Sequence, residues 1–419
     1  MKRHVIAIAL LGGLLAGSVA ACRDGEHPIS DAAGVTSEPC PKAVDRSKGC
    51  IYLGIISDLT VGPRAAEAAA VTEAQQKFWD RVNRAGGIGG HEVDVVTYVR
   101  DNRSNPTTHV RAYQEIRGKV LALAQTMGEY GTAAILSDLR ADSTVAVPAS
   151  WTSAWAYEPG MLASGANYCV EGMNTVDFAR AGSTVRSVMS VHLPGDYGDD
   201  GAAGVKLAAD ANGMTFINIK TDPGADKQEG AVGAIVARQP DVVVLTTTAA
   251  ETEVIVRQAV ERGYRGRIIG AGRSWDPALL RGPAAAALKA NYVRAAPWGP
   301  WNANTAGHRE MRDALGSLAP QDGHVSGWIW SYPLKAALDT AAAGDNLTHK
   351  GLYAAARAQT TVDYQGMLPA GTSNRTANQT MVLSPATGSG VADVPVVRDF
   401  FAGPTVERTR LDRPCFQDL

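Results

Sequence analysis

Short apolar runs alternate with longer amphipathic segments along most of the chain. Between residues 64 and 84, Val71, Ala74 and Phe78 recur at spacings of three and four, which places them on one face of a helix. The preceding run, 51–57, is apolar almost throughout, as strands buried on both faces are. This alternation predicts βα units, in which helices cover both faces of a parallel sheet.

The predicted strands fall into two successive sets. The first set is expected at 51–57, 93–99, 120–125 and 144–147. The second set is expected at 187–192, 215–219, 241–246 and 267–270. Helical segments separate these strands, and a late helix at about 328–343 precedes short pieces rich in Gly, Ser and Thr. Two similar α/β halves in one chain predict two lobes.

The N-terminal segment has the order of a secretory signal. Lys2 and Arg3 precede an apolar run that is too short to span a bilayer, and small residues follow it. The string LLAGSVAAC, which ends at Cys22, resembles the bacterial lipobox. That resemblance implies a lipid anchor on Cys22 after removal of residues 1–21. An ordinary signal peptide cut nearby is the alternative.

The five cysteines fit an oxidising compartment outside the cytoplasm. Lipidation of Cys22 leaves four, which allow three pairings. Cys40 and Cys50 close a small loop and are the preferred pair, which leaves Cys169 to hold Cys415 and the C-terminal tail. No pair has C-x-x-C spacing and the histidines do not cluster near the cysteines, so no metal site is expected.

Composition excludes several functional classes. The chain is 45% hydrophobic and 20% charged, with 40 basic against 42 acidic residues. Nothing is basic enough for nucleic acid, and no second apolar run is long enough for a membrane helix. A body of about 400 residues suits two domains. We therefore expect a globular body held to the outer face of the cell membrane by its lipidated N-terminus.

Several local strings carry a family resemblance over roughly residues 50–385. They are IYLGIISDLT at 51–60, VNRAGGIGGH at 82–91, PGDYG at 194–198 and PDVVVLTT at 240–247. In this order the chain resembles the type I periplasmic solute-binding proteins, in particular the branched-chain amino acid-binding subfamily of ABC importers. The resemblance implies an α/β fold of two Rossmann-like lobes with parallel sheets, joined by a multi-strand hinge. The lobes would close on a small solute and hand it to a membrane permease, without a cofactor.

The expected division of the chain follows the two lobes. Residues 1–21 are the signal peptide and 22–49 a polar tether. The first lobe is expected at 50–170 with a return segment at 297–355, and the second at 171–296 with its return and the C-terminal tail at 356–419. In open α/β sheets, ligands lie outside the carboxyl ends of the strands, so the strand-to-helix loops of both lobes should line the cleft.

Two residues of the second lobe match family positions. The resemblance implies that the ring of Tyr197 covers the solute, whereas a surface turn residue is the alternative. Glu251 falls where amino acid-binding members carry the acid that receives the ligand's ammonium group. Thr248 and Glu251 also form a capping box, so Glu251 has a structural explanation, and both roles are compatible if the two carboxylate oxygens divide them.

One loop of the first lobe departs from the family pattern. The resemblance implies a serine- and threonine-rich turn for the ligand's carboxylate, but this chain has TMGEYGT at 126–132. Beyond Tyr130, only Thr126 and Thr132 remain as hydroxyls, and Glu129 would repel a carboxylate. An ordinary α-amino acid ligand is therefore in doubt.

Further candidates belong to loops that are expected at the same cleft. Seven of the eight tryptophans fall between Trp151 and Trp330, which favours a larger or more apolar solute, although each one also fits core or hinge packing. An arginine could bind a carboxylate bidentately in place of the missing hydroxyls, or simply be exposed. These candidates are Ser150, Trp151, Thr152, Arg273, Trp275 and Trp298.

Catalytic motifs are missing from the sequence. It has no G-x-S-x-G elbow, no H-E-x-x-H, no P-loop and no G-x-G-x-x-G after the first strand. We therefore expect a solute-binding protein of an ABC importer rather than an enzyme, with an amino acid-like compound or an aromatic or apolar carboxylate as ligand. The alternatives are a ligand-sensing clamp that reports to a membrane receptor and, less favoured, a secreted hydrolase.

Overall fold

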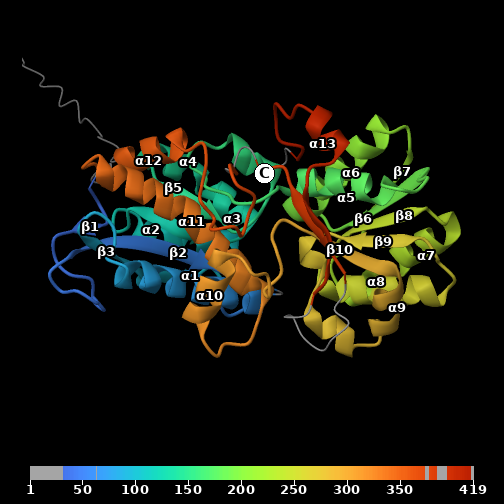
Figure 1. Cartoon of the computed structure of the whole chain (residues 1–419), viewed down its shortest axis with the longest axis horizontal. Coiled ribbons are helices and arrows are strands. Elements are labelled where there is room, and N and C mark those ends of the chain that lie inside the picture. The colour runs from blue at the N-terminus through green and yellow to red at the C-terminus, as the bar shows by residue number, and fades with distance from the viewer. Residues whose placement is uncertain (1–31, 63, 373–376, 385–393, 417–419) are drawn as a thin grey trace, which may run out of the picture.

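The chain folds into two α/β lobes that lie side by side (Figure 1). The computed structural model describes residues 32–62, 64–372, 377–384 and 394–416. The signal segment and Cys22 lie outside these residues. Within the described part of the chain, no helix is long and apolar enough to cross a membrane.

The first lobe is built around a mainly parallel sheet. Its central strand β2 pairs with β3 on one side and β4 on the other, and β5 follows β4. The strands are β1 (Val35–Thr36, antiparallel to β2), β2 (Gly49–Ser57), β3 (His91–Asp101), β4 (Ala122–Thr126) and β5 (Val145–Pro148). The helices are α1 (Ala65–Arg84), α2 (Pro106–Ile116), α3 (Glu129–Ala134) and α4 (Leu136–Asp142). The four strands predicted for this lobe are thus confirmed as β2 to β5.

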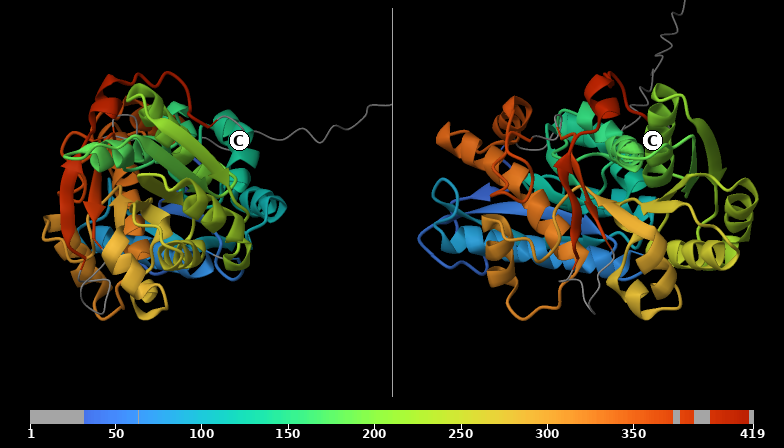
Figure 2. Two further views of the ribbon diagram at one scale, coloured as in Figure 1. Left: turned by 90° about the vertical axis from the view of Figure 1, so that its right-hand side faces the viewer. Right: turned by 45° about the vertical axis from the view of Figure 1, so that its right-hand side comes forward.

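The second lobe contains a seven-stranded sheet in the order β12-β11-β10-β9-β8-β6-β7. The strands are β6 (Ser187–His192), β7 (Thr215–Lys220), β8 (Val242–Thr246), β9 (Arg267–Gly270), β10 (Tyr292–Ala296), β11 (Thr380–Leu383) and β12 (Val396–Phe401). Strands β6 to β9 are parallel, as predicted. Strand β10, which was not predicted, continues the parallel order beside β9, and β11 and β12 add an antiparallel edge beside it (Figure 2). The helices are α5 (Tyr168–Arg180), α6 (Asp196–Ala211), α7 (Glu229–Arg238), α8 (Ala249–Glu261), α9 (Ala285–Asn291) and α13 (Pro404–Arg408).

The chain crosses between the lobes after β5, after β10 and again before β11. After the second crossing, α10 (Ala306–Leu315), α11 and α12 (His349–Ala358) return to the first lobe. Val362 and Leu368 belong to the hydrophobic core around the first sheet. The return to the second lobe therefore lies after Leu368, later than the boundary at 356 that the sequence indicated, because apolar residues in the loop after α12 still pack on the first lobe.

Helix α11 (Asp322–Ala343) begins earlier than the predicted start at 328. Its first turns contain Gly323 and Gly327, and glycine weakens the helical signal of a sequence. These glycines let α11 approach α1 closely, since a Cβ atom on Gly327 would lie 2.4 Å from the Val71 carbonyl oxygen. Packing against α1 therefore holds the turns that periodicity alone does not indicate.

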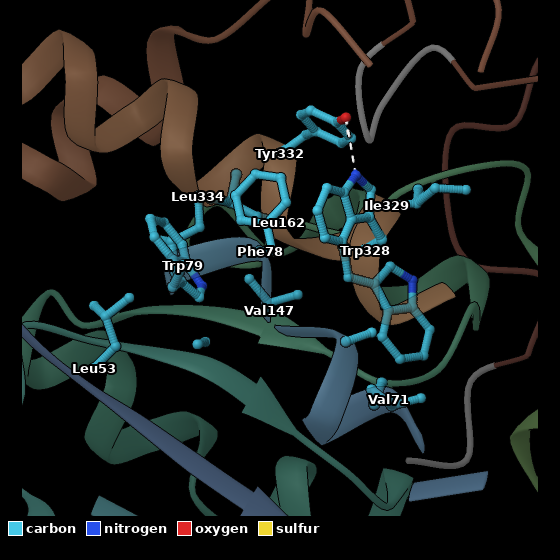
Figure 3. Packing of buried hydrophobic residues seen from close by; sticks show 14 of the residues in the cluster. Leu53, Val71, Phe78, Trp79, Val147, Leu162, Trp328, Ile329, Tyr332 and Leu334 are labelled. Atoms are coloured by element: carbon cyan, nitrogen blue, oxygen red, sulfur yellow. Dashed lines mark hydrogen bonds between the residues drawn. The ribbon is translucent and has the colours of Figure 1, made fainter. Parts of the chain in front are cut away.

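Aromatic side chains fill the interface between α1 and α11. The ring of Phe78 lies edge-on to those of Trp79, Trp328 and Tyr332, with centroids 5.0 to 5.4 Å apart (Figure 3). Trp328 donates its indole N–H to the Tyr332 hydroxyl over 3.1 Å. Edge-to-face geometry of this kind stabilises an aromatic pair beyond the area it buries. The interface fixes the start of α11, which borders the cleft between the lobes.

The cysteines lie in the pairs expected from the sequence. The sulfur atoms of Cys40 and Cys50 are at bonding distance, and so are those of Cys169, on α5, and Cys415, in the C-terminal tail. The second pair joins residues 246 positions apart. Formation of both bonds in the mature protein remains a prediction.

Candidate functional site

A cavity of about 610 Å³ lies between the lobes. The first lobe contributes the starts of α1 and α11, and the second lobe contributes the start of α8 and the loop after β9. The cavity thus lies at the carboxyl ends of strands, as expected for open α/β sheets. Its volume is within the range of small-molecule sites in proteins.

Trp151 forms the aromatic wall of the cavity. Its ring lies between Trp298, from the crossover after β10, and Trp330, on α11, with both centroids 4.7 Å away. The indole N–H of Trp151 donates to the Ser164 carbonyl oxygen over 2.7 Å, which leaves the ring no polar group to offer a ligand. Tyr168 approaches the same ring edge-on at 6.0 Å. This wall is therefore rigid and apolar.

A second aromatic surface belongs to the other lobe. Trp275 is stacked nearly parallel on Tyr292 of β10, with centroids 6.0 Å apart, and lines the cavity beside Leu279. The Tyr292 hydroxyl is hydrogen-bonded to Ser274 over 2.7 Å, which anchors this ring from behind. Both lobes therefore present flat apolar groups to the space between them.

Arg273 carries a positive charge that has no acidic partner. Among the described residues it forms no ion pair and no hydrogen bond, and its guanidinium lies 4.9 Å from the centroid of the Tyr197 ring. The other two arginines of the cavity are paired: Arg64 with Asp58 at 3.3 Å, and Arg294 with Asp322 at 2.5 Å. A guanidinium on an aromatic face keeps its donors available, so Arg273 can bind an anion.

The ion pair of Arg294 joins the two lobes directly. Arg294 is on β10 of the second lobe, and Asp322 is the first residue of α11 on the first lobe. Both side chains line the cavity. The pair is a contact that lobe opening would have to break.

Glu171, on α5, is the buried acid of the cavity. Only 2% of it is exposed, and one carboxylate oxygen accepts the Gly272 backbone N–H over 2.8 Å. Burial raises the pKa of Glu171 to about 7, although the Gly272 N–H and the charge of Arg294 both favour the ionised form. At neutral pH this side chain is therefore present in both protonation states.

Four of the predicted site residues line the cavity, namely Trp151, Arg273, Trp275 and Trp298. Tyr197 lies behind it: its ring supports Arg273, and its hydroxyl donates to the Thr247 carbonyl oxygen over 3.2 Å. Direct contact between any of these side chains and a solute remains a proposal.

Glu251 belongs to the capping box of α8. One of its oxygens accepts the Gly224 N–H over 2.8 Å, and the other accepts the N–H and the hydroxyl of Thr248. Both oxygens are thus engaged within the second lobe, which argues against the predicted role as an ammonium ligand. Neither Ser150 nor Thr152 lines the cavity, because the Ser150 hydroxyl accepts the Trp155 indole N–H and Thr152 caps a short 3-10 helix.

Glu129 and Tyr130 meet the second lobe at a different place. A Cβ atom on Gly195 would lie 3.5 Å from a Glu129 carboxylate oxygen and 3.6 Å from the Tyr130 hydroxyl. Neither residue lines the cavity. Burial and the Glu129 carboxylate raise the pKa of the neighbouring Asp196. These residues therefore form an interlobe contact beside the cavity rather than part of its wall.

Several cavity residues were not identified from the sequence. Tyr168 and Glu171 lie at the start of α5. This helix was not predicted, because it is buried on nearly all sides and its sequence therefore has only a weak amphipathic pattern. Arg294 lies on β10, which was likewise not predicted. The sequence signal that could have indicated the start of α5 is the helix cap at Asn167, whose side chain accepts the Val170 N–H.

A cysteine cluster in the described chain resembles a metal site only superficially. The ligand atoms of Cys169, Asp200 and Cys415 lie within 4.8 Å of one another. The two sulfur atoms are at bonding distance, and a disulfide offers no thiolate. We assign no metal to this cluster.

The chain matches the model of a known family across most of its length. Residues 51–390 match the model described as periplasmic binding protein. No curated protein matches the chain in sequence.

Solved structures share the fold. A fatty acid ABC transporter substrate-binding protein from Thermomonospora curvata has a TM-score of 0.78 and 24% identity, over 90% of this chain and 97% of that one. A branched-chain amino acid ABC transporter protein from Thermus thermophilus with bound valine has a TM-score of 0.72 and 14% identity, over 86% and 98%. A leucine-binding protein from Thermotoga maritima has a TM-score of 0.68 and 16% identity, over 84% and 98%. Identities this low show the fold alone.

Proposed function

This chain belongs to the periplasmic binding protein family, and we propose that it captures a small organic solute between its lobes and delivers it to an ABC importer. Members of this family bind substrates outside the cytoplasm rather than convert them. The observation that carries the proposal is a cavity with walls from both lobes, because a ligand that contacts both lobes stabilises the closed form.

The solute we propose is a carboxylate with an apolar body. Arg273 supplies a cation without an acidic partner, and aromatic rings from both lobes supply apolar walls. A carboxylate in such a site gains charge-assisted hydrogen bonds, while the rest of the solute gains from burial.

A free α-amino acid fits this chain less well. Both oxygens of Glu251 already accept hydrogen bonds within the second lobe, so the ammonium group of an amino acid ligand would need a different carboxylate as its partner. Of the three similar structures described above, one is named for fatty acids and two for amino acids, so apolar carboxylates and branched-chain amino acids are the classes to compare.

We also propose that Cys22 is lipidated and holds the protein on the outer face of the membrane. The lipobox-like string before Cys22 supports this. Replacing Cys22 with alanine should release the protein from membranes into the soluble fraction. Retention of that variant in membranes would contradict the lipid anchor.

The binding proposal is tested by calorimetry on the soluble body, begun after Cys22. The probes are octanoate, phenylacetate, the amides of both acids, leucine and valine. Loss of a charge-assisted hydrogen bond costs about 1.5 to 3 kcal/mol, so Arg273→Gln should weaken carboxylate binding by about 10- to 100-fold. Amide binding should change little.

The control is Arg262→Gln, since Arg262 pairs with Glu229 on the exposed surface of the second lobe. It should bind every probe as the wild type does. Tight binding of leucine or valine with no binding of octanoate or phenylacetate would overturn the assignment of solute class. Equal affinities of wild type and Arg273→Gln for the carboxylates would remove Arg273 from the site.

A further inference from the structure

Glu171 is the buried acid of the cavity that the proposed function does not yet use. Gly272 N–H binds one of its oxygens, and the other has no hydrogen-bond partner among the residues that the structure describes. That oxygen is not among the fully buried side-chain atoms that lack a partner in the described chain, so it is accessible from the cavity, where a ligand or water can complete its hydrogen bonding. Its position in the cavity wall makes a solute the natural partner.

No neighbouring basic side chain of the described residues forms an ion pair with the Glu171 carboxylate. Arg294 is engaged with Asp322, and the guanidinium of Arg273 lies over the Tyr197 ring. The titratable and charged groups of the cavity and its surroundings are Arg294 and Tyr292 on β10, Arg273 and Asp276 after β9, Tyr197 on α6, Tyr168 on α5 itself, and Arg64, Glu67 and Asp322 across the cavity. Without an ion pair of its own, Glu171 changes its protonation state easily when a charged group enters the cavity.

We propose that Glu171, in its protonated form, donates a hydrogen bond to the carboxylate of the solute, so that capture of the solute takes up a proton. The inference rests on the proposed carboxylate ligand. An ionised Glu171 would place two carboxylates side by side, which is unfavourable, whereas the neutral acid offers an O–H donor to complement Arg273. No covalent step is involved: the proton comes from solvent and stays on Glu171.

The burial of Glu171 sets the pH range of this effect. Because burial raises its pKa to about 7, the binding-competent form predominates at pH 6 and is a minor species at pH 8. Apparent affinity scales with the competent fraction, so the Kd of a carboxylate should rise about tenfold between pH 6 and pH 8. Octanoate and phenylacetate remain ionised across this range, so the change belongs to the protein.

The variant Glu171→Gln separates this mechanism from a structural role. Its amide oxygen can still accept the Gly272 N–H, and its NH₂ group mimics the neutral acid at every pH. Calorimetry with octanoate and phenylacetate between pH 6 and pH 8 should show a nearly constant Kd for Glu171→Gln and a rising Kd for the wild type. In two buffers of different ionisation enthalpy, the wild type alone should take up close to one proton at pH 8.

A ligand-free readout accompanies these measurements. The folded pKa of Glu171, about 7, exceeds its ordinary value of 4.5, so its stabilising contribution is complete below pH 4.5 and is lost as pH rises through 7. The melting temperature of the wild type should therefore fall relative to Glu171→Gln between pH 5 and pH 8. Other buried acids, such as Asp196 and Asp200, are present in both proteins and cancel in the comparison.

The outcomes distinguish this inference from the proposed function. If both proteins bind octanoate or phenylacetate with the same pH profile, or if the wild type binds more tightly as pH rises, Glu171 does not donate to the solute. If neither carboxylate binds either protein at any pH, the carboxylate ligand itself fails and this inference fails with it.

Discussion

Trp151 offers the sharpest test of how the cavity wall is held. The ring is 4% exposed, lies between two other indoles and donates its N–H to a buried carbonyl oxygen. Trp151→Ala should destabilise the protein by about 3 to 5 kcal/mol, the usual cost of removing a fully packed aromatic ring. Trp151→Phe keeps most of the ring contacts but leaves the Ser164 carbonyl oxygen without its donor, at a cost of about 1 to 3 kcal/mol.

The assay is urea unfolding followed by far-ultraviolet circular dichroism, because tryptophan fluorescence changes when a tryptophan is removed. The expected order of stability is wild type, Trp151→Phe, Trp151→Ala. The difference in unfolding free energy between Trp151→Phe and Trp151→Ala measures the ring contacts. The difference between the wild type and Trp151→Phe measures mainly the hydrogen bond. A Trp151→Ala variant within about 1 kcal/mol of the wild type would refute the claim that this ring joins α11 to the crossover after β10.

Two further predictions use the same unfolding assay. Gly327→Ala should destabilise by about 1 to 3 kcal/mol, because its Cβ would lie 2.4 Å from a backbone oxygen of α1. Gly344→Ala, where the nearest atom would be 3.7 Å away, should stay within about 0.5 kcal/mol, and equal costs would contradict the close helix contact. Replacing Cys169 and Cys415 together by alanine should cost about 5 kcal/mol, because a bond between them would close a loop of 246 positions. Peptide mapping without reduction should recover the two cysteines linked, and a cost below about 1 kcal/mol would refute the loop-entropy argument.

The sequence alone determined much of the fold because its signals are local. Strands β2 and β8 are continuous apolar runs, and α1 carries a regular apolar stripe. Each of these elements can therefore be predicted from its own short stretch of sequence. The preferred cysteine pairing, chosen because residues 40 and 50 would close a short loop, agrees with the sulfur atoms that lie at bonding distance. The family resemblance came from strings at strand ends, and the match over residues 51–390 confirms it.

Other elements depend on contacts between distant segments. Helix α5 is buried on nearly all sides, so it lacks the polar face that would reveal it. Strands β11 and β12 are short, and they form a sheet edge only because β10 offers unpaired backbone groups beside them. Neither pattern can be detected without knowing what packs against it.

The candidate site shows the same division. The sequence singled out Trp151, Arg273, Trp275 and Trp298 because their residue types suit an apolar anion, and the fold brings these four to one cavity. Local sequence also revealed the capping box of Glu251, but only the tertiary structure showed that both its oxygens are occupied. The importance of Glu171 arises from burial and from the absence of a charged partner within the described chain, which no local pattern encodes. The sequence therefore determined the residue types and the elements with strong local patterns. Protonation state, free hydrogen-bonding capacity and position in the cavity were decided by segments far away along the chain, because each depends on what packs against the residue.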